Sequence, residues 1–127
     1  MTLTTLYSGQ GYIISALIIN RHCLVQEFLL GLDKQSEVQI LSLLKRTGDN
    51  GPSINGEKFK HLKGKIYELK TRTGVRVLSF FGEGKSLILT HGFFKPSKKK
   101  LQFEIGKAAE WEKTYQEHIK TQKKEKR

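Results

Sequence analysis

The chain is poor in cysteine and has no apolar run long enough to cross a membrane. Its single cysteine, Cys23, excludes a disulfide within one copy of the chain and leaves no Cys-x-x-Cys pair or His/Cys spacing typical of a zinc site. We therefore expect a protein of the reducing cytoplasm. The most apolar stretch, residues 11–25, is interrupted by Asn20, Arg21 and His22 and is too short for a span. It also lacks a basic leader and a small-residue cleavage site, so we expect no signal peptide.

The sequence also lacks the residue patterns of several enzyme classes. No Ser/His/Asp order, metal-ligand cluster or pair of carboxylates emerges from it. The segment GEGK at residues 82–85 resembles a nucleotide loop, but no helix is expected after it, so we interpret it as a hairpin turn. If the protein is an enzyme, its chemistry should use neither metal nor cofactor and should depend on Lys, Arg and either Glu or His.

The sequence does contain an excess of positive charge, and this excess lies in the second half of the chain. Residues 1–55 hold four Lys/Arg and four Asp/Glu, whereas residues 56–127 carry the whole net charge of +11. This distribution favours a protein that binds a polyanion with its second half. At 127 residues we expect a single domain, 1–127, with residues 1–10 flexible and the basic tail 120–127 disordered.

Periodicity predicts an α+β fold with the element order β-α-α-β-β-β-α. The first strand is expected over residues 12–20. Helices over 24–32 and 34–47 form a helical hairpin, with Asp33 capping the second helix and Gly48 ending it. An antiparallel meander and a last helix beginning near Leu101 complete the fold. The strands of the meander are expected at 66–71, 75–81 and 86–94, because hairpin-length turns separate them.

The first basic cluster lies on this meander. Side chains two apart on a strand share a face, so Glu68, Lys70 and Arg72 should lie together. Arg76 follows a tight turn and is the only charge in 75–81. An Arg in an apolar strand needs an anionic partner or an open face. An ion pair with Glu68 and a role in phosphate binding are both open, and one does not exclude the other.

The second basic cluster is the turn FKPSKKK at residues 94–100, just before the last helix. Free amides at a helix N-terminus attract phosphate, and these lysines add positive charge there. The alternative is a solvated surface run. His91, at the end of the last strand, is open to a structural or a catalytic role.

Several short segments resemble the HigB-like toxins of the RelE/ParE superfamily, which include phage-derived members. Residues 59–70, FKHLKGKIYELK, resemble the family's K-x-L-x-x-G-L-Y-E-L-R. Residues 76–81 resemble its R-V-L-Y-F, and residues 89–95 its L-x-H-G-F-x-K-K. Residues 26–29 and 104–108 fit its x-E-F-L and E-I-x-x-A. The order and spacing of these segments make the match more specific than any one of them.

The resemblance implies a RelE/ParE-like fold, in which an N-terminal strand and a helical hairpin pack on a small antiparallel sheet with a C-terminal helix. It implies a cytoplasmic toxin of a type II toxin–antitoxin system, partnered by a helix-turn-helix antitoxin of the HigA kind. RelE-like members cleave mRNA on the ribosome without a metal and so inhibit translation. ParE-like relatives inhibit gyrase instead, so a non-catalytic basic binding module is the alternative. A DNA-binding repressor is disfavoured, because the basic charge does not lie on a recognition helix.

In RelE-like cleavage the RNA 2′-hydroxyl attacks the adjacent phosphate. By motif, Lys70 would act as base or orient the phosphate, Arg76 would stabilise transition-state charge, and Lys95 with Lys98 or Lys99 would clamp the phosphate. Expected RNA contacts are Lys63, Lys65, Arg72, Lys98 and Lys100. The family's E-L-R reads E-L-K here, and the region where RelE has a tyrosine after the basic turn reads Leu101-Gln102-Phe103. The general acid is therefore open among Lys98, Lys99, His91 and Glu68.

Overall fold

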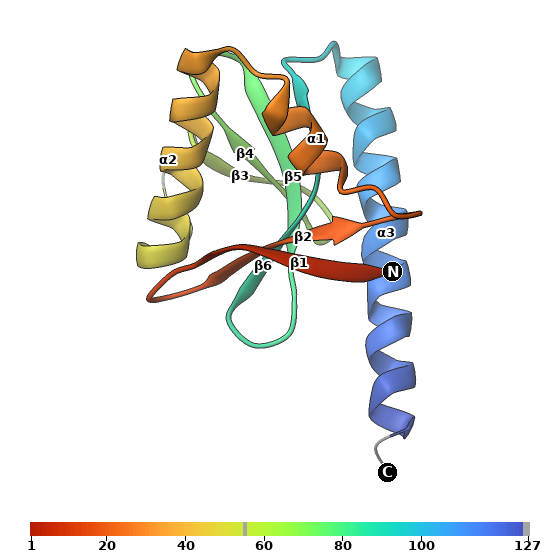
Figure 1. Ribbon diagram of the computed structural model, residues 1–127. Coiled ribbons are helices and arrows are strands. Elements are labelled where there is room, and N and C mark those ends of the chain that lie inside the picture. Colours follow the sequence, from red (N-terminus) through yellow and green to blue (C-terminus); the bar gives the residue numbers. More distant parts are fainter. Residues whose placement is uncertain (55, 126–127) are drawn as a thin grey trace.

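The computed structural model describes residues 1–54 and 56–125, and Figure 1 shows their arrangement. Six strands form a single sheet, and three helices accompany it in the described chain. The elements are β1 Thr2–Ser8, β2 Ile13–Ile18, α1 Leu24–Leu30, α2 Lys34–Asn50, β3 Phe59–Lys63, β4 Ile66–Lys70, β5 Val75–Phe81, β6 Ser86–Phe94 and α3 Lys98–Glu125. The expected α+β fold is confirmed.

The sheet has the strand order β1-β2-β6-β5-β4-β3. The expected meander is present as β4, β5 and β6, which pair antiparallel with one another. The β2–β6 pair is parallel, and the other pairs are antiparallel. The sheet thus contains two more strands than predicted, β1 and β3.

Regular secondary structure reaches close to both ends of the described residues. Residues 1–10, expected to be flexible, contain β1, whose backbone pairs antiparallel with β2. This ladder supplies the hydrogen-bond partners that keep the terminal segment in place. The tail was expected to be disordered from residue 120, but α3 continues through Glu125. Residues 126–127 lie outside the described residues.

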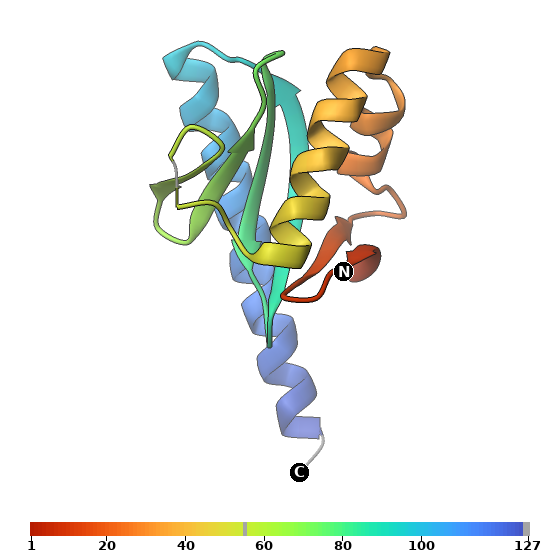
Figure 2. The ribbon, with the colours of Figure 1, turned by 90° about the vertical axis from the view of Figure 1, so that its left-hand side faces the viewer.

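The helices cover both faces of the sheet, as Figure 2 shows. On one face, Val25 and Leu29 of α1 and Ile40 of α2 join a core cluster with Val77 and Leu89 of the sheet. The opposite face carries a second cluster, in which α3 contributes Ile105, Ala108 and Tyr115. The alternation of side chains along the central strands therefore divides them between two cores.

The predicted limits of the helices were partly right. Asp33 caps α2 as expected, because its carboxylate accepts a hydrogen bond of 3.1 Å from the backbone N–H of Ser36. Gly48 does not end the helix, which continues to Asn50 with Gly51 at the C-cap. A Cβ on Gly48 would lie only 2.7 Å from the ring of Tyr7, so this glycine permits β1 to approach α2 closely.

The last helix begins at Lys98, three residues earlier than expected. Ser97 stabilises this start, since its hydroxyl accepts a hydrogen bond of 3.2 Å from the backbone N–H of Lys100. The lysine run therefore forms the first turn of α3. None of the helices in residues 1–54 and 56–125 is long and apolar enough to span a membrane.

Candidate nucleic-acid interface

A cleft of about 480 Å³ opens between α2 and the ends of β4 and β5. One wall comes from the sheet, with Lys70 and Arg76, and from the β4–β5 turn, with Arg72, while α2 forms the other. The basic lining residues outnumber the acidic one, Glu57; they are Arg46, Lys58, Lys70, Arg72 and Arg76. A cleft with this excess of positive charge suits the phosphate groups of a nucleic acid.

Two of the predicted catalytic residues lie opposite each other on neighbouring strands. Lys70 of β4 is the direct ladder partner of Arg76 in β5. Directly opposite side chains on neighbouring antiparallel strands project from the same face of the sheet. The first basic cluster of the sequence is therefore brought together in space at the end of the sheet, where both residues border the cleft. Leu69 and Val75 pack into the core on the α2 side, so Lys70 and Arg76 project from the face that carries α3.

Arg76 is held in place by neighbouring groups. Its Nε lies 3.7 Å from Oε2 of Glu68, and the two side chains are only 14% and 6% exposed. Its Nη1 donates a hydrogen bond of 3.2 Å to the carbonyl of Val75. Arg76 also lines the cleft. A guanidinium has five N–H donors, so the ion pair with Glu68 leaves donors for a phosphate.

The lysine turn lies at the same end of the sheet as this basic pair. The backbone N–H of Lys95 donates a hydrogen bond of 2.8 Å to the carbonyl of Gly74, in the turn between β4 and β5. Lys95, Lys98, Lys99 and Lys100 are all exposed. Within the described chain they are not part of the cleft wall, so they form a second basic surface next to it.

Lys63 and Lys65 lie elsewhere. They flank the turn between β3 and β4, at the opposite end of β4 from Lys70. There they line a cavity of about 360 Å³ against α3, and Lys65 Nζ lies 4.0 Å from Oε2 of Glu112. The structure thus divides the expected RNA contacts between the two ends of the sheet.

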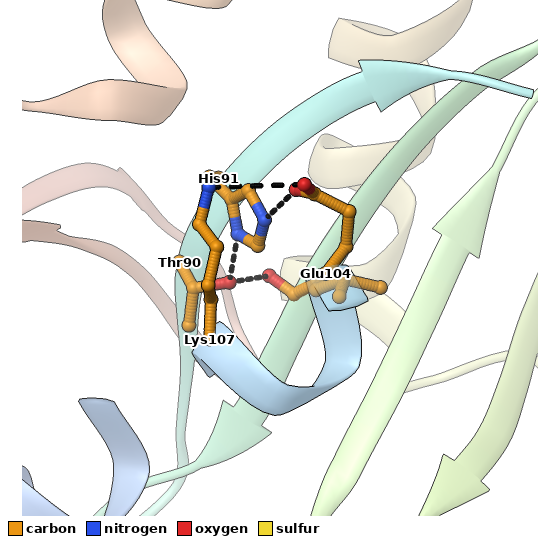
Figure 3. A network of polar contacts seen from close by, with 5 residues as sticks. Thr90, His91, Glu104 and Lys107 are labelled. Atoms are coloured by element: carbon orange, nitrogen blue, oxygen red, sulfur yellow. Dashed lines mark hydrogen bonds and ion pairs between the residues drawn. The ribbon is translucent and has the colours of Figure 1, made fainter. Parts of the chain in front are cut away.

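His91 is buried in a network that connects β6 with α3 (Figure 3). Its Nε2 lies 2.6 Å from Oε2 of Glu104, and its Nδ1 lies 2.9 Å from the hydroxyl of Thr90. Its ring and that of Trp111 are nearly perpendicular, at a centroid distance of 5.1 Å. Burial lowers the pKa of His91, and this effect outweighs the opposing influence of the Glu104 carboxylate. Through these contacts, His91 forms a buried connection between β6 and α3.

The chain matches a known protein family. The family model described as "Phage derived protein Gp49-like (DUF891)" matches residues 27–127. The chain belongs to this Gp49-like family. The family is part of the RelE/HigB-type toxins, whose members are generally endoribonucleases and act with an antitoxin partner. No curated protein matches the chain.

The match of this Gp49-like chain includes both walls of the cleft, whereas β1, β2 and the first residues of α1 precede it. Among the residues that the structure describes, no group of three or more His, Cys, Asp or Glu side chains lies together in the way that metal ligands do. The residues that line the basic cleft all lie within the matched segment.

The α2 wall of the cleft was not predicted. It includes Gln39, Ser42 and Arg46, whose i, i+3, i+7 spacing places them on one side of the helix. The Oε1 of Gln39 accepts a hydrogen bond of 3.3 Å from the backbone N–H of Thr73, which connects α2 to the β4–β5 turn. In the sequence, the only signal was the Lys45-Arg46 pair on an expected helix, and this pattern is common on solvated helix surfaces.

Proposed function

We propose that this Gp49-like protein is the toxin of a type II toxin–antitoxin system, and that it acts in the cytoplasm as an endoribonuclease of mRNA. The observation that carries the proposal is that Lys70, Arg72 and Arg76 all line one basic cleft, and that a buried carboxylate orients Arg76. A pre-oriented guanidinium next to further positive charge is suited to a phosphate that gains charge during reaction.

In the proposed reaction, the RNA 2′-oxygen forms a bond to the adjacent phosphorus while the bond from phosphorus to the 5′-oxygen breaks. Lys70 orients the phosphate or takes the 2′-hydroxyl proton, and Arg76 stabilises the charge on the phosphorane oxygens. Lys95 with Lys98 or Lys99 holds the strand from the neighbouring turn. This reaction requires no metal or cofactor.

The general acid protonates the leaving 5′-oxygen. Of the four candidates, Glu68 and His91 are buried and already paired, whereas Lys98 and Lys99 are exposed in the first turn of α3. A general acid must come within hydrogen-bonding distance of the group that it protonates. We therefore favour Lys98 or Lys99 for this role.

The proposal includes two further partners. The ribosome would present mRNA to the cleft, so that cleavage inhibits translation, and a HigA-like helix-turn-helix antitoxin would bind the toxin. The neighbouring open reading frame tests the second point directly. A small helix-turn-helix protein encoded there supports the pairing, and its co-purification with the toxin would establish it.

Mapping of mRNA 5′ ends after induced expression tests the activity. New 5′ ends should appear in cells that express the wild-type protein, and Arg76→Ala should lower cleavage by about 10²-fold or more, the effect of losing one donor to a developing oxyanion. Arg21→Ala, an exposed arginine outside the cleft, is the matched control. Equal cleavage by the Arg76→Ala protein, at equal folded concentration, would contradict the catalytic role.

The second candidate function is that of a non-catalytic basic module, such as a ParE-like gyrase inhibitor. One observation favours it: two of the four candidate general acids, Glu68 and His91, are buried and already paired. The two functions differ in what the purified protein does. Inhibition of gyrase supercoiling without any RNA cleavage would support this candidate and contradict the first.

A further inference from the structure

The two edges of the sheet differ in charge. β1 forms one edge and β3 the other in the described chain. An edge strand presents backbone N–H and C=O groups that have no ladder partner, and lysines on such a strand discourage pairing with another chain. β3 carries Lys60, His61 and Lys63, whereas β1, with the sequence TLTTLYS, has neither a charged residue nor a proline. β1 is therefore the edge without this protection.

An apolar groove lies next to β1. It has a volume of about 430 Å³, and its walls include Leu6 and Tyr7 of β1, Leu30 of α1 and Leu41 of α2. Leu30 is 83% exposed and Leu41 is 47% exposed. Leu3 of β1 is also exposed. The exposed leucines of α1, α2 and β1 therefore form an apolar surface that adjoins the unprotected edge.

This surface belongs to the neutral half of the chain. β1, α1 and α2 all lie within residues 1–55, which have no net charge, whereas the net charge of +11 belongs to residues 56–127. The groove itself contains one acidic and one basic residue, Glu37 and Lys45. Two copies that meet at this surface bring uncharged edge strands together. A two-fold axis can place the acidic residue of each groove opposite the basic residue of the other, so the surface is complementary to itself.

We propose that this surface binds a second copy of the chain, with β1 of each copy pairing antiparallel across a two-fold axis. The pairing would give hydrogen-bond partners to the backbone N–H and C=O groups at the β1 edge of both sheets, and it would cover the leucines of both grooves. Residues of α2 that line the groove, such as Leu41 and Lys45, differ from those that line the cleft, such as Ser42 and Arg46. The dimer would thus leave both clefts open. The proposal does not depend on the proposed ribonuclease function.

Light scattering on the full chain during size-exclusion chromatography tests this proposal without RNA. At micromolar concentration and above, the mass should be twice 14.6 kDa. The variant Thr2→Lys/Thr5→Lys, at two exposed edge positions, should be monomeric. Thr114→Lys/Thr121→Lys adds the same charge at exposed positions of α3 and should leave the dimer intact. A monomeric wild-type protein would overturn the proposal and leave the edge to a different protein.

Cross-linking keeps the test decisive if the lysine variant fails to fold. In a two-fold β1–β1 pair, residues near the axis lie next to their own copies, so Thr5→Cys should form a disulfide-linked dimer on oxidation when Cys23 is replaced by Ser. Lys60→Cys on the opposite edge strand is the matched control. A dimer that cross-links through Lys60→Cys and not through Thr5→Cys would contradict the β1 interface.

Discussion

Arg76 is held by a carboxylate that is itself buried. The Glu68 side chain is 6% exposed and lies 3.7 Å from Arg76 Nε. Removing one member of a buried ion pair leaves the other charge without compensation, which destabilises the site and frees the remaining side chain to move. In the proposed mechanism, Glu68 therefore acts through the position of Arg76.

Glu68→Gln tests this positioning role. We expect cleavage to fall by about 10- to 100-fold, because a small displacement of a catalytic group costs that much. The decisive measurement is a double-mutant cycle. In an Arg76→Ala background, Glu68→Gln should have almost no further effect on the rate. An undiminished effect there, with both variants folded, would mean that Glu68 acts independently of Arg76.

A second buried pair, His91 with Glu104, predicts how stability depends on pH. Burial lowers the pKa of His91 in the folded protein. As pH falls through about 6.5, the ordinary pKa of histidine, the unfolded chain therefore takes up this proton before the folded protein does. The free energy of unfolding should decrease from that pH down to the folded pKa and then become independent of this group.

Urea unfolding at a series of pH values measures this dependence. His91→Gln should remove the His91 contribution below pH about 6.5. His118→Gln, at an exposed position of α3, is the control and should keep the wild-type slope. If the wild-type and His91→Gln proteins had parallel profiles, the buried histidine would not be the titrating group.

At the scale of elements, α2 separates two surfaces of different character. Gln39, Ser42 and Arg46 line the basic cleft, whereas Leu41 and Lys45 line the apolar groove. Neighbours in the sequence thus point to different sides of the helix, as its periodicity of 3.6 residues requires. One helix can therefore contribute to RNA binding on one side and to self-association on the other.

This arrangement makes Arg46 and Lys45 a matched pair of substitutions. Arg46→Ala should weaken RNA binding and reduce the slope of log affinity against log salt by about one, the effect of losing one phosphate contact. Lys45→Ala removes the same charge from the next residue and should leave the slope nearly unchanged. Binding titrations at several salt concentrations measure both values. Equal slopes for the two variants would show that the cleft wall on α2 does not contact RNA.

At the scale of the whole molecule, the positive charge is divided between separate surfaces. The cleft and the lysine turn share one end of the sheet, where the backbone of Lys95 bonds to that of Gly74. Lys63 and Lys65 lie at the other end, against α3. If RNA binds at the cleft, the first group should contribute more to affinity than the second.

Two double variants compare these ends of the molecule. Lys98→Ser/Lys99→Ser should reduce the salt slope of RNA binding by about two, since each phosphate contact contributes about one. Lys63→Ser/Lys65→Ser loses the same charge and should reduce the slope by less. The order of the two slopes is the readout. A larger loss for the second variant would place the RNA path along β4 and α3 in place of the turn.

The sequence alone determined the helices, the capping of α2 by Asp33 and the β4–β5–β6 meander. These features depend on local signals: the period of apolar residues, a capping side chain and turns of hairpin length. β1 and β3 were missed because their sequences have no clear apolar alternation. They become strands because neighbouring strands offer hydrogen-bond partners along an edge.

The tertiary structure decided which charges meet. Lys70 and Arg76 were predicted to be neighbours, because a short turn joins their strands and sets the register. The approach of Arg46, the burial of His91 against Glu104 and the separation of Lys63 and Lys65 from the cleft depend on how helices pack on the two faces of the sheet. Such contacts join residues far apart in the chain, and a local sequence pattern does not contain them.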